Sequence, residues 1–234
     1  MTILDIGSNI GYYAIMQLKL LKNTGKLIAV EPSKSNVNLL HENLKLNGYL
    51  NEIEIHNKAV SNKNGKRLFF ISKHSNLNTF HNTGSGKKFL QGKKIIVNTI
   101  TIKKLLNGRK VDLIRMDVEG HEVSILDSLI SLIKIKKFYP DIIFETHISR
   151  YNYSNNMLST LKKIFNLGYK ITIAGTSSEK GTVLLKKLGY DTSFKLRSDD
   201  EVRSIIKNIK NEDAINLICK TGGLRTVTLS KTEI

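Results

Sequence analysis

The sequence predicts an α/β fold built on a mostly parallel, buried sheet. Three observations lead to this class. Short apolar runs of strand length alternate along the chain with segments of helical length and composition. Several of the apolar runs end in glycine or in an acidic residue. Strands separated by helix-length segments require crossover connections, which place helices on both faces of a parallel sheet.

The first sixty residues carry the clearest alternation. Ser33 is the predicted N-cap of the second helix and Gly48 its predicted stop, because serine caps helix N-termini and glycine often follows the last turn. A core strand that begins at Thr2 also indicates a truncated or unusually short N-terminus. The predicted elements are a strand over Thr2–Ile6, a helix over Tyr12–Leu21, a strand over Lys26–Val30, a helix from Lys34 to about Asn47 and a strand over Ile53–His56.

The rest of the chain continues this alternation, with two less regular segments. Residues 61–110 and 176–212 are predicted insertions in one domain that spans residues 1–234. The predicted elements are strands over Arg67–Ile71 and Lys94–Val97, a helix over Thr101–Leu106, a strand over Val111–Met116, a helix over Val123–Ile135, a strand over Asp141–Phe144, a helix over Asn155–Leu167, a strand over Lys170–Ala174 and a helix around Asp200–Ile209. Two final strands, Ala214–Cys219 and Leu224–Leu229, are predicted to pair around Gly222–Gly223 as an antiparallel edge.

The composition excludes several classes of protein. The single cysteine, Cys219, excludes an internal disulfide framework and a cysteine-based zinc site, and no metal site is predicted. No run approaches the roughly 20 apolar residues that span a bilayer, and Asp5 and Asn9 interrupt the apolar start, so no signal peptide is predicted. With 40% hydrophobic and 24% charged residues, the chain is expected to be a cytoplasmic globular protein.

The positive charge is concentrated in one segment. The formal net charge is +17, and residues 61–110 carry twelve lysines and arginines but no acidic residue. This segment is either a solvated lysine-rich face or a positive rim for an anionic small molecule, glycan, lipid surface or nucleic acid. The loop of this segment is expected to lie over the ligand-binding site. Its basic residues are Lys73, His74, Lys87, Lys88, Lys93 and Lys94.

The first predicted strand runs into a glycine-rich turn, Asp5-Ile6-Gly7-Ser8-Asn9-Ile10-Gly11. Ligands of open α/β sheets bind beyond the carboxyl ends of the strands. Gly7 and Gly11 allow a tight turn and a close approach of a ligand, and Gly11 opens a helix whose free N–H groups favour an anion. Asp5 favours an α-amino group and disfavours a diphosphate. The combination suits the methionine part of S-adenosylmethionine, with a purely structural strand–helix turn as the alternative.

The next two strands carry an acid and a small residue. Glu31 lies 26 residues after Asp5, where an acid accepts the hydroxyl groups of a ribose, and Pro32 ends its strand. A surface acid is the alternative. Ala59, after the third strand, leaves room for an adenine ring, although a plain loop explains it equally well.

The last two strands deliver acidic residues and histidines. The segment Asp117-Val118-Glu119-Gly120-His121-Glu122 follows an apolar strand, and three acids there are costly unless they are partnered or hydrated. Asp117 and Glu119 share a face if the chain is extended, and helix capping is the alternative role. Glu145 and His147 suit proton transfer or binding of a substrate hydroxyl, against roles as ordinary core or surface residues.

Taken together, these motifs resemble the FkbM family of methyltransferases over about residues 2–175. The resemblance implies a Rossmann-like class I methyltransferase fold, with a seven-stranded, mostly parallel sheet, an antiparallel edge strand and helices on both faces. It also implies S-adenosyl-L-methionine as methyl donor and O-methylation of a sugar, glycan, lipid-linked or other small-metabolite hydroxyl. The usual family segment before the first strand is absent, and residues 176–212 match no part of the family pattern.

Site residues follow from the motifs and from this resemblance. Glu119 or His147 is the hypothesised base, and Asp117 has an orienting role. The two alternative functions are an RNA methyltransferase and a non-catalytic Rossmann-like module that binds a nucleotide or anion. The residues predicted to bind the cofactor are Asp5, Gly7, Ser8, Asn9, Gly11, Tyr12, Glu31, Pro32, Ala59 and Asp117.

Overall fold

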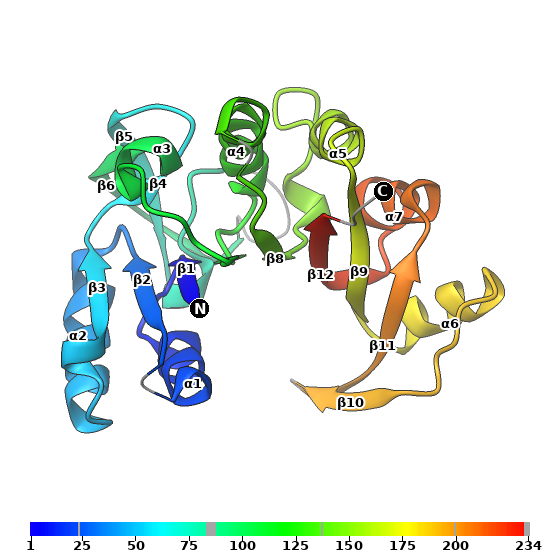
Figure 1. Cartoon of the computed structure of the whole chain (residues 1–234), viewed down its shortest axis with the longest axis horizontal. Coiled ribbons are helices and arrows are strands. Elements are labelled where there is room, and N and C mark those ends of the chain that lie inside the picture. The colour runs from blue at the N-terminus through cyan, green and yellow to red at the C-terminus, as the bar shows by residue number, and fades with distance from the viewer. Residues whose placement is uncertain (23, 83–87, 137, 199, 232–234) are drawn as a thin grey trace. The chain divides into compact units, whose positions relative to one another are not determined.

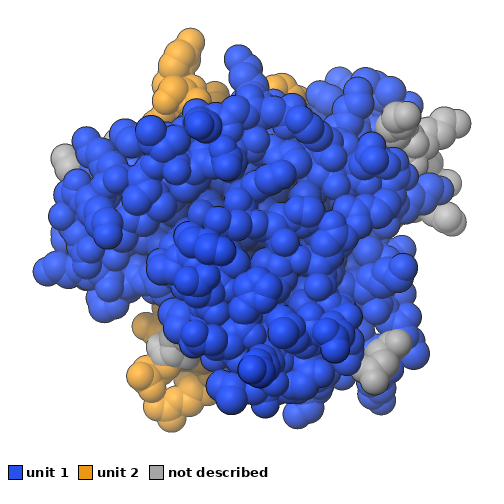
Figure 2. Space-filling model, turned by 90° about the vertical axis from the view of Figure 1, so that its left-hand side faces the viewer, with its two compact units in different colours: residues 1–140 blue, residues 141–234 orange. Residues whose placement is uncertain are grey.

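The computed structural model describes residues 1–22, 24–82, 88–136, 138–198 and 200–231 (Figure 1). The chain forms two compact units, residues 1–140 and 141–234, which are coloured separately in Figure 2 and are described in turn. The prediction of one domain over residues 1–234 stays a prediction. None of the helices in the described ranges is long and apolar enough to cross a membrane.

Unit 1 contains a parallel sheet in the order β3-β2-β1-β7, of which Figure 1 labels β3, β2 and β1. All its neighbouring strands are parallel, and Asp5 pairs in register with Ala29 on one side and with Arg115 on the other. Parallel pairing brings the carboxyl ends of these strands to one edge. The strands are β1 (Thr2–Ile6), β2 (Lys26–Val30), β3 (Ile53–His56) and β7 (Leu113–Met116).

Helices α1 (Tyr12–Leu21) and α2 (Lys34–Leu46) pack on β1 and β2. Their buried apolar residues recur at helical spacing, as Ala14, Leu18 and Leu21 do in α1. The side chain of Ser33 caps α2 by accepting a hydrogen bond from the Asn36 N–H, and Gly48 follows its end with a φ of 77°. These observations confirm the predicted boundaries. The 3₁₀ turn Leu50–Glu52 then leads into β3.

The basic insertion forms a separate three-stranded sheet in the order β4-β6-β5. Both long strands extend beyond the predicted ranges because β5 and β6 form a long antiparallel ladder, with one irregularity between Phe70 and Ser72. The elements of this part of unit 1 are β4 (Ala59–Val60), β5 (Gly65–Ser72), a 3₁₀ turn (Ser75–Leu77), β6 (Leu90–Ile100), α3 (Ile102–Leu106) and, after β7, α4 (Glu122–Lys136).

Unit 2 contains an antiparallel arrangement in the order β8-β12-β9-β11-β10. The α/β class is confirmed. In the described residues, the four strands of the unit 1 sheet and the strands β8, β9 and β12 of unit 2 correspond to the seven strands that the family resemblance implies. The hairpin β10–β11 adds two further antiparallel strands at the edge. The elements are β8 (Asp141–Glu145), a 3₁₀ turn (Ile148–Arg150), α5 (Met157–Phe165), β9 (Tyr169–Thr176), α6 (Glu179–Lys187), β10 (Lys195–Ser198), β11 (Glu201–Ile209), α7 (Asn211–Cys219) and β12 (Leu224–Lys231).

Two sequence predictions in unit 2 are wrong. The segment predicted as a helix around Asp200–Ile209 is strand β11, which pairs with β9 and is rich in β-branched residues. The segment predicted as a strand over Ala214–Cys219 is helix α7. Its acidic first turn and its buried residues at helical spacing favour a helix.

The position of the last strand also differs from the prediction. Because α7 is a helix, Gly222–Gly223 connects it to β12 and does not close a hairpin. Strand β12 lies between β8 and β9 and pairs with both, so it is an interior strand.

Candidate functional site

Unit 1 has a pocket at the carboxyl ends of β1, β2 and β7. Its outline takes in about 570 Å³, which includes open solvent. The loop after β3 and the basic insertion complete its wall. The predicted site residues that line it are Gly7, Asn9, Glu31, Pro32, Ala59, Asp117 and Glu119. Asp5, Ser8, Gly11 and Tyr12 belong to the same turn but do not line the pocket.

The turn after β1 has three residues in the left-handed region. Gly7, Asn9 and Gly11 have φ values of 81°, 49° and 95°. A Cβ atom on Gly7 would lie 2.1 Å from the backbone oxygen of Asp117, so glycine is required where the two strand tips pass. Ser8 donates its hydroxyl to the backbone oxygen of Asp5 at 3.0 Å, which secures the turn from inside.

Glu31 is buried at the tip of β2 and receives three hydrogen bonds. Its Oε1 accepts from the Ser33 N–H at 2.9 Å and from Nδ2 of Asn36 at 3.3 Å, and its Oε2 accepts from the Asn9 N–H at 3.0 Å. Burial raises the pKa of Glu31 to about 7, against the lowering effect of these donors. A carboxylate offers about four acceptor positions, so about one remains, on Oε2.

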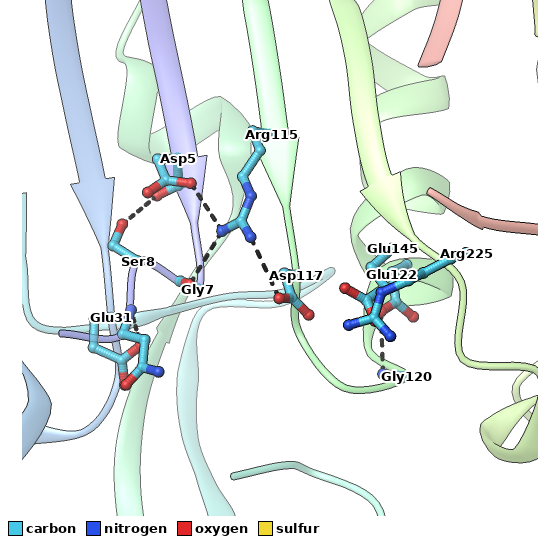
Figure 3. Close-up of polar contacts among 11 residues, drawn as sticks. Asp5, Gly7, Ser8, Glu31, Arg115, Asp117, Gly120, Glu122, Glu145 and Arg225 are labelled. Atoms are coloured by element: carbon cyan, nitrogen blue, oxygen red, sulfur yellow. Dashed lines mark hydrogen bonds and ion pairs between the residues drawn. The ribbon is translucent and has the colours of Figure 1, made fainter. Parts of the chain in front are cut away.

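Asp5 is fully buried and is paired with an arginine that the sequence analysis missed. Nη1 of Arg115 lies 3.2 Å from Oδ1 of Asp5, and Nη2 lies 3.3 Å from Oδ2 of Asp117 (Figure 3). The guanidinium carbon lies 4.1 Å above the ring centre of Tyr13. Burial lowers the pKa of Arg115, but the charges of Asp5 and Asp117 outweigh this effect and leave it above its usual value. The direct contact predicted between Asp5 and an α-amino group stays a prediction.

A signal for Arg115 was present in the sequence. It is the one charged residue between Leu113 and Met116, and a charge inside a buried strand requires a partner. The sequence does not show the parallel register of β1 and β7, which places Asp5 directly opposite Arg115.

The loop after β7 turns sharply around Glu119. Its φ of 51° lies in the left-handed region, as does the φ of 98° at Gly120. The chain is therefore not extended at Glu119, so the shared face expected for Asp117 and Glu119 in an extended chain does not apply, although both residues line the pocket. The hydroxyl of Thr79 donates to the backbone oxygen of Glu119 at 2.8 Å, and Glu122 accepts from the Gly120 N–H at 3.1 Å at the start of α4. Strained backbone of this kind is common at functional sites.

His121 lines the pocket as a buried, neutral imidazole. Its Nε2 is 3.1 Å from Oγ of Ser61, which also accepts from Nη1 of Arg67 at 3.3 Å. Its ring lies 4.6 Å from the ring of Phe80, measured between centres. Burial and the neighbouring charge of Arg67 lower the pKa of His121 to about 3. His121 belongs to the motif Asp117–Glu122, but its pattern in the sequence predicts no role for it.

The basic insertion contributes an aromatic and polar wall to the pocket. Phe69 and Phe80 line it, with their ring centres 4.9 Å apart, together with Asn76 and Asn78. Lys58, before the insertion, is the lysine among the lining residues. Of the basic residues expected to overhang the site, Lys87 lies outside the described residues and the others do not line the pocket: Lys73, His74, Lys88, Lys93 and Lys94.

The remaining predicted residues lie in unit 2, at the end of β8. Nη2 of Arg225 lies 3.2 Å from Oε1 of Glu145, and the hydroxyl of Thr146 donates to the Leu224 backbone oxygen at 2.7 Å. The backbone N–H of His147 donates to the hydroxyl oxygen of Tyr151 at 2.9 Å. The contacts with Arg225 and Leu224 hold the tip of β8 against β12. The proposed roles of His147 and Glu119 in proton transfer stay predictions.

The fold and the strand-tip pocket define a class of protein, an α/β protein with a pocket at the carboxyl ends of its parallel strands. The model of the methyltransferase FkbM domain matches residues 5–171, and the chain belongs to this family. The resemblance inferred from the motifs is confirmed. A comparison with curated proteins finds no match.

Two solved structures are similar to this chain over part of their length. A crystal structure of methyltransferase FkbM from Methylobacillus flagellatus is 16% identical with a TM-score of 0.47, over 69% of this chain and 36% of that one. A SAM-dependent O-methyltransferase from Thermotoga maritima is 13% identical with a TM-score of 0.45, over 100% of this chain and 60% of that one. The chain thus spans about a third of the first protein's length.

Proposed function

We propose that the chain is a cytoplasmic S-adenosylmethionine-dependent O-methyltransferase that binds its cofactor in the pocket of unit 1. The observation that carries the proposal is the buried carboxylate of Glu31. It lines the pocket, is fixed by three donors and keeps about one acceptor position. A ribose hydroxyl is a donor that suits this position.

Other features of the pocket fit the same cofactor. Oδ1 of Asn9 is buried without a hydrogen-bond partner in the described part of the chain, so it supplies a further acceptor. Pro32, Ala59 and Val60 form an apolar patch beside Glu31 that suits an adenine ring. The cofactor, when bound, supplies an activated methyl group. The protein's task is then to hold the acceptor hydroxyl in line and to receive its proton.

Asp117 and Glu119 are assigned different parts in that task. Nη2 of Arg115 lies 3.3 Å from Oδ2 of Asp117 and fixes the direction of this carboxyl group, so we assign Asp117 the orientation of ligand groups. Glu119 lines the pocket, and its backbone is fixed by Thr79. We assign Glu119, or His147 from unit 2, as the base that receives the proton. The acceptor we propose is a hydroxyl of a sugar, glycan, lipid-linked or other small molecule, with an anionic group matched to the basic insertion.

Calorimetric titration with S-adenosylhomocysteine, NAD and ATP tests the proposal. At a pH above the value of about 7 to which burial raises the pKa of Glu31, we expect binding of S-adenosylhomocysteine alone. Glu31→Gln should bind it at least about tenfold more weakly, because hydrogen bonds to charged groups contribute about 1.5–3 kcal/mol. Glu42→Gln, which changes an exposed acid of α2, is the matched control and should bind normally. Binding of NAD or ATP without S-adenosylhomocysteine would show a different nucleotide module and end the proposal.

A further inference from the structure

The antiparallel hairpin of β5 and β6 has two different faces. Its inner face carries Phe69, Ile95 and Val97, which form a small core with Ala59. Side chains alternate along a strand, so the intervening residues lie on the opposite, outer face. The residues of this outer face are Lys66, Leu68 and Phe70 on β5 and Lys94, Ile96 and Asn98 on β6.

The centre of the outer face is apolar and exposed. Leu68 and Ile96 stand directly opposite one another in the ladder and are 47% and 71% exposed. Lys66 pairs with Asn98 on one side of them, and Phe70 pairs with Lys94 on the other. Two exposed aliphatic side chains are thus flanked by a lysine at each end.

The segment that forms this face carries charge of one sign. The outer face itself carries no acid, and neither does any other position from residue 61 to residue 110, which carry twelve basic residues. Such a segment attracts a polyanionic surface over the range of a Debye length, about 8–10 Å at moderate salt.

We propose that the outer face of the β5–β6 hairpin docks on an anionic lipid membrane, with Leu68 and Ile96 entering the headgroup region and Lys66 and Lys94 contacting lipid phosphates. Apolar area and basic residues act together in reversible binding to anionic bilayers. Lysine stems lie along apolar surface while their ammonium groups reach the phosphates.

The side chains at the centre of the face favour lipid over nucleic acid. Proteins that bind single-stranded nucleic acid present exposed aromatic rings on which bases stack. Here the exposed pair is aliphatic, and the one aromatic residue, Phe70, has Nζ of Lys94 placed 5.6 Å above its ring centre. Aliphatic side chains have no stacking partner on RNA but gain from transfer into a bilayer.

Vesicle co-sedimentation of the full chain tests this proposal. Vesicles of phosphatidylcholine alone are compared with vesicles of equal parts phosphatidylcholine and phosphatidylglycerol. We expect binding to the anionic vesicles only. Lys66→Glu should weaken it at least about tenfold, since each basic residue near an anionic surface contributes roughly a fivefold factor. Ile96→Ser should weaken binding severalfold and make the remainder more sensitive to salt.

The double variant Lys45→Glu with Leu46→Ser is the matched control. It makes the same kinds of change at the end of α2, where Leu46 is 83% exposed, and α2 lies at the opposite end of unit 1 from the hairpin (Figure 1). It should bind anionic vesicles like the unchanged chain. Equal binding by all variants, binding to neutral vesicles alone, or binding to polyuridylic acid but not to vesicles would each overturn the proposal.

The test is separate from that of the cofactor site. None of the substituted residues lines the pocket, so binding of S-adenosylhomocysteine should be unchanged in Lys66→Glu and Ile96→Ser. Loss of vesicle binding with retained nucleoside binding supports the docking face. A chain that binds vesicles as expected but no nucleoside retains the docking face and loses the proposed function.

Discussion

Asp5 and Arg115 stand opposite one another in the register of β1 and β7, with Nη1 of Arg115 3.2 Å from Oδ1 of Asp5. Both side chains are largely removed from water, and the same guanidinium reaches Asp117 at 3.3 Å. One buried cation therefore connects the tips of two strands that form the pocket. Its cost of burial is offset only while its partners remain in place.

The first prediction concerns this buried pair. Arg115→Met should lower the free energy of unfolding by about 3–5 kcal/mol, because it leaves the carboxylate of Asp5 buried and unpaired. Asp5→Asn combined with Arg115→Met should recover part of this loss. Urea denaturation of the single and double variants measures both effects.

The exposed pair Arg109–Glu54 provides the control. Each side chain is more than 40% exposed, so Arg109→Met should cost no more than about 1 kcal/mol. If Arg115→Met were no more harmful than Arg109→Met, the structural importance of the Asp5 pair would be refuted.

The second prediction concerns the tight turn after β1. Gly7→Ala should destabilise the protein and weaken nucleoside binding, because the added Cβ meets the Asp117 backbone oxygen and the φ is 81°. Gly48→Ala has a similar φ of 77° but meets nothing within 4 Å, so it should cost only about 1–2 kcal/mol and leave binding intact. Thermal unfolding and calorimetry distinguish the two, and equal behaviour of the pair would contradict the prediction.

The third prediction is a pH dependence of stability with two opposed contributions. The pKa of Glu31 is raised from 4.5 to about 7, so the folded state binds the extra proton and this contribution falls as the pH rises through that range. The pKa of His121 is lowered from 6.5 to about 3, so the unfolded state binds the extra proton and this contribution rises with pH. The two should nearly cancel between pH 4.5 and 6.5.

Variants separate these contributions. Relative to the unchanged chain between pH 4.5 and 6.5, Glu31→Gln should gain stability with rising pH and His121→Phe should lose it, each by about 1.4 kcal/mol per pH unit at most. Urea unfolding across this range measures the slopes. Parallel curves for all three proteins would show that neither group titrates as described.

The fourth prediction concerns the base. Substitution of the true base, in Glu119→Gln or His147→Gln, should lower turnover roughly 10²- to 10⁴-fold while S-adenosylhomocysteine binding stays the same. The other variant of the two should retain most of its activity. The measurement is methyl transfer under saturating cofactor, and full activity in both variants would remove both residues from the role.

Residues of the pocket could be predicted from the sequence where their role depends on their immediate neighbours in the chain. Gly7 is required by a left-handed φ and a close contact, and Glu31 follows directly from the end of an apolar strand. Glu119 lines the pocket, but its left-handed φ could not be predicted, because alternation along a strand says nothing about the turn that follows. The role of Arg115 was missed because its partners are 110 and two residues away.

In unit 2 the prediction failed where an apolar run was too short to show its period. Ala214–Cys219 contains too few residues to distinguish helical spacing from strand spacing. The acidic residues Glu212 and Asp213 just before it are the local signal that favours the start of a helix. The strand β11 was read as a helix because its partner β9 lies some thirty residues earlier. The pattern of residues within a short segment does not show that the segment pairs with a distant strand.

The sequence by itself determined the alternation of strands and helices in unit 1, the glycine turn, the acid at the end of β2 and the family, because each depends on neighbouring residues. Only the tertiary structure decided which charges neutralise one another, which residues face the pocket and where β12 enters its sheet. These depend on register and packing between distant segments, and the free energy of a buried charge is set by the groups around it in space.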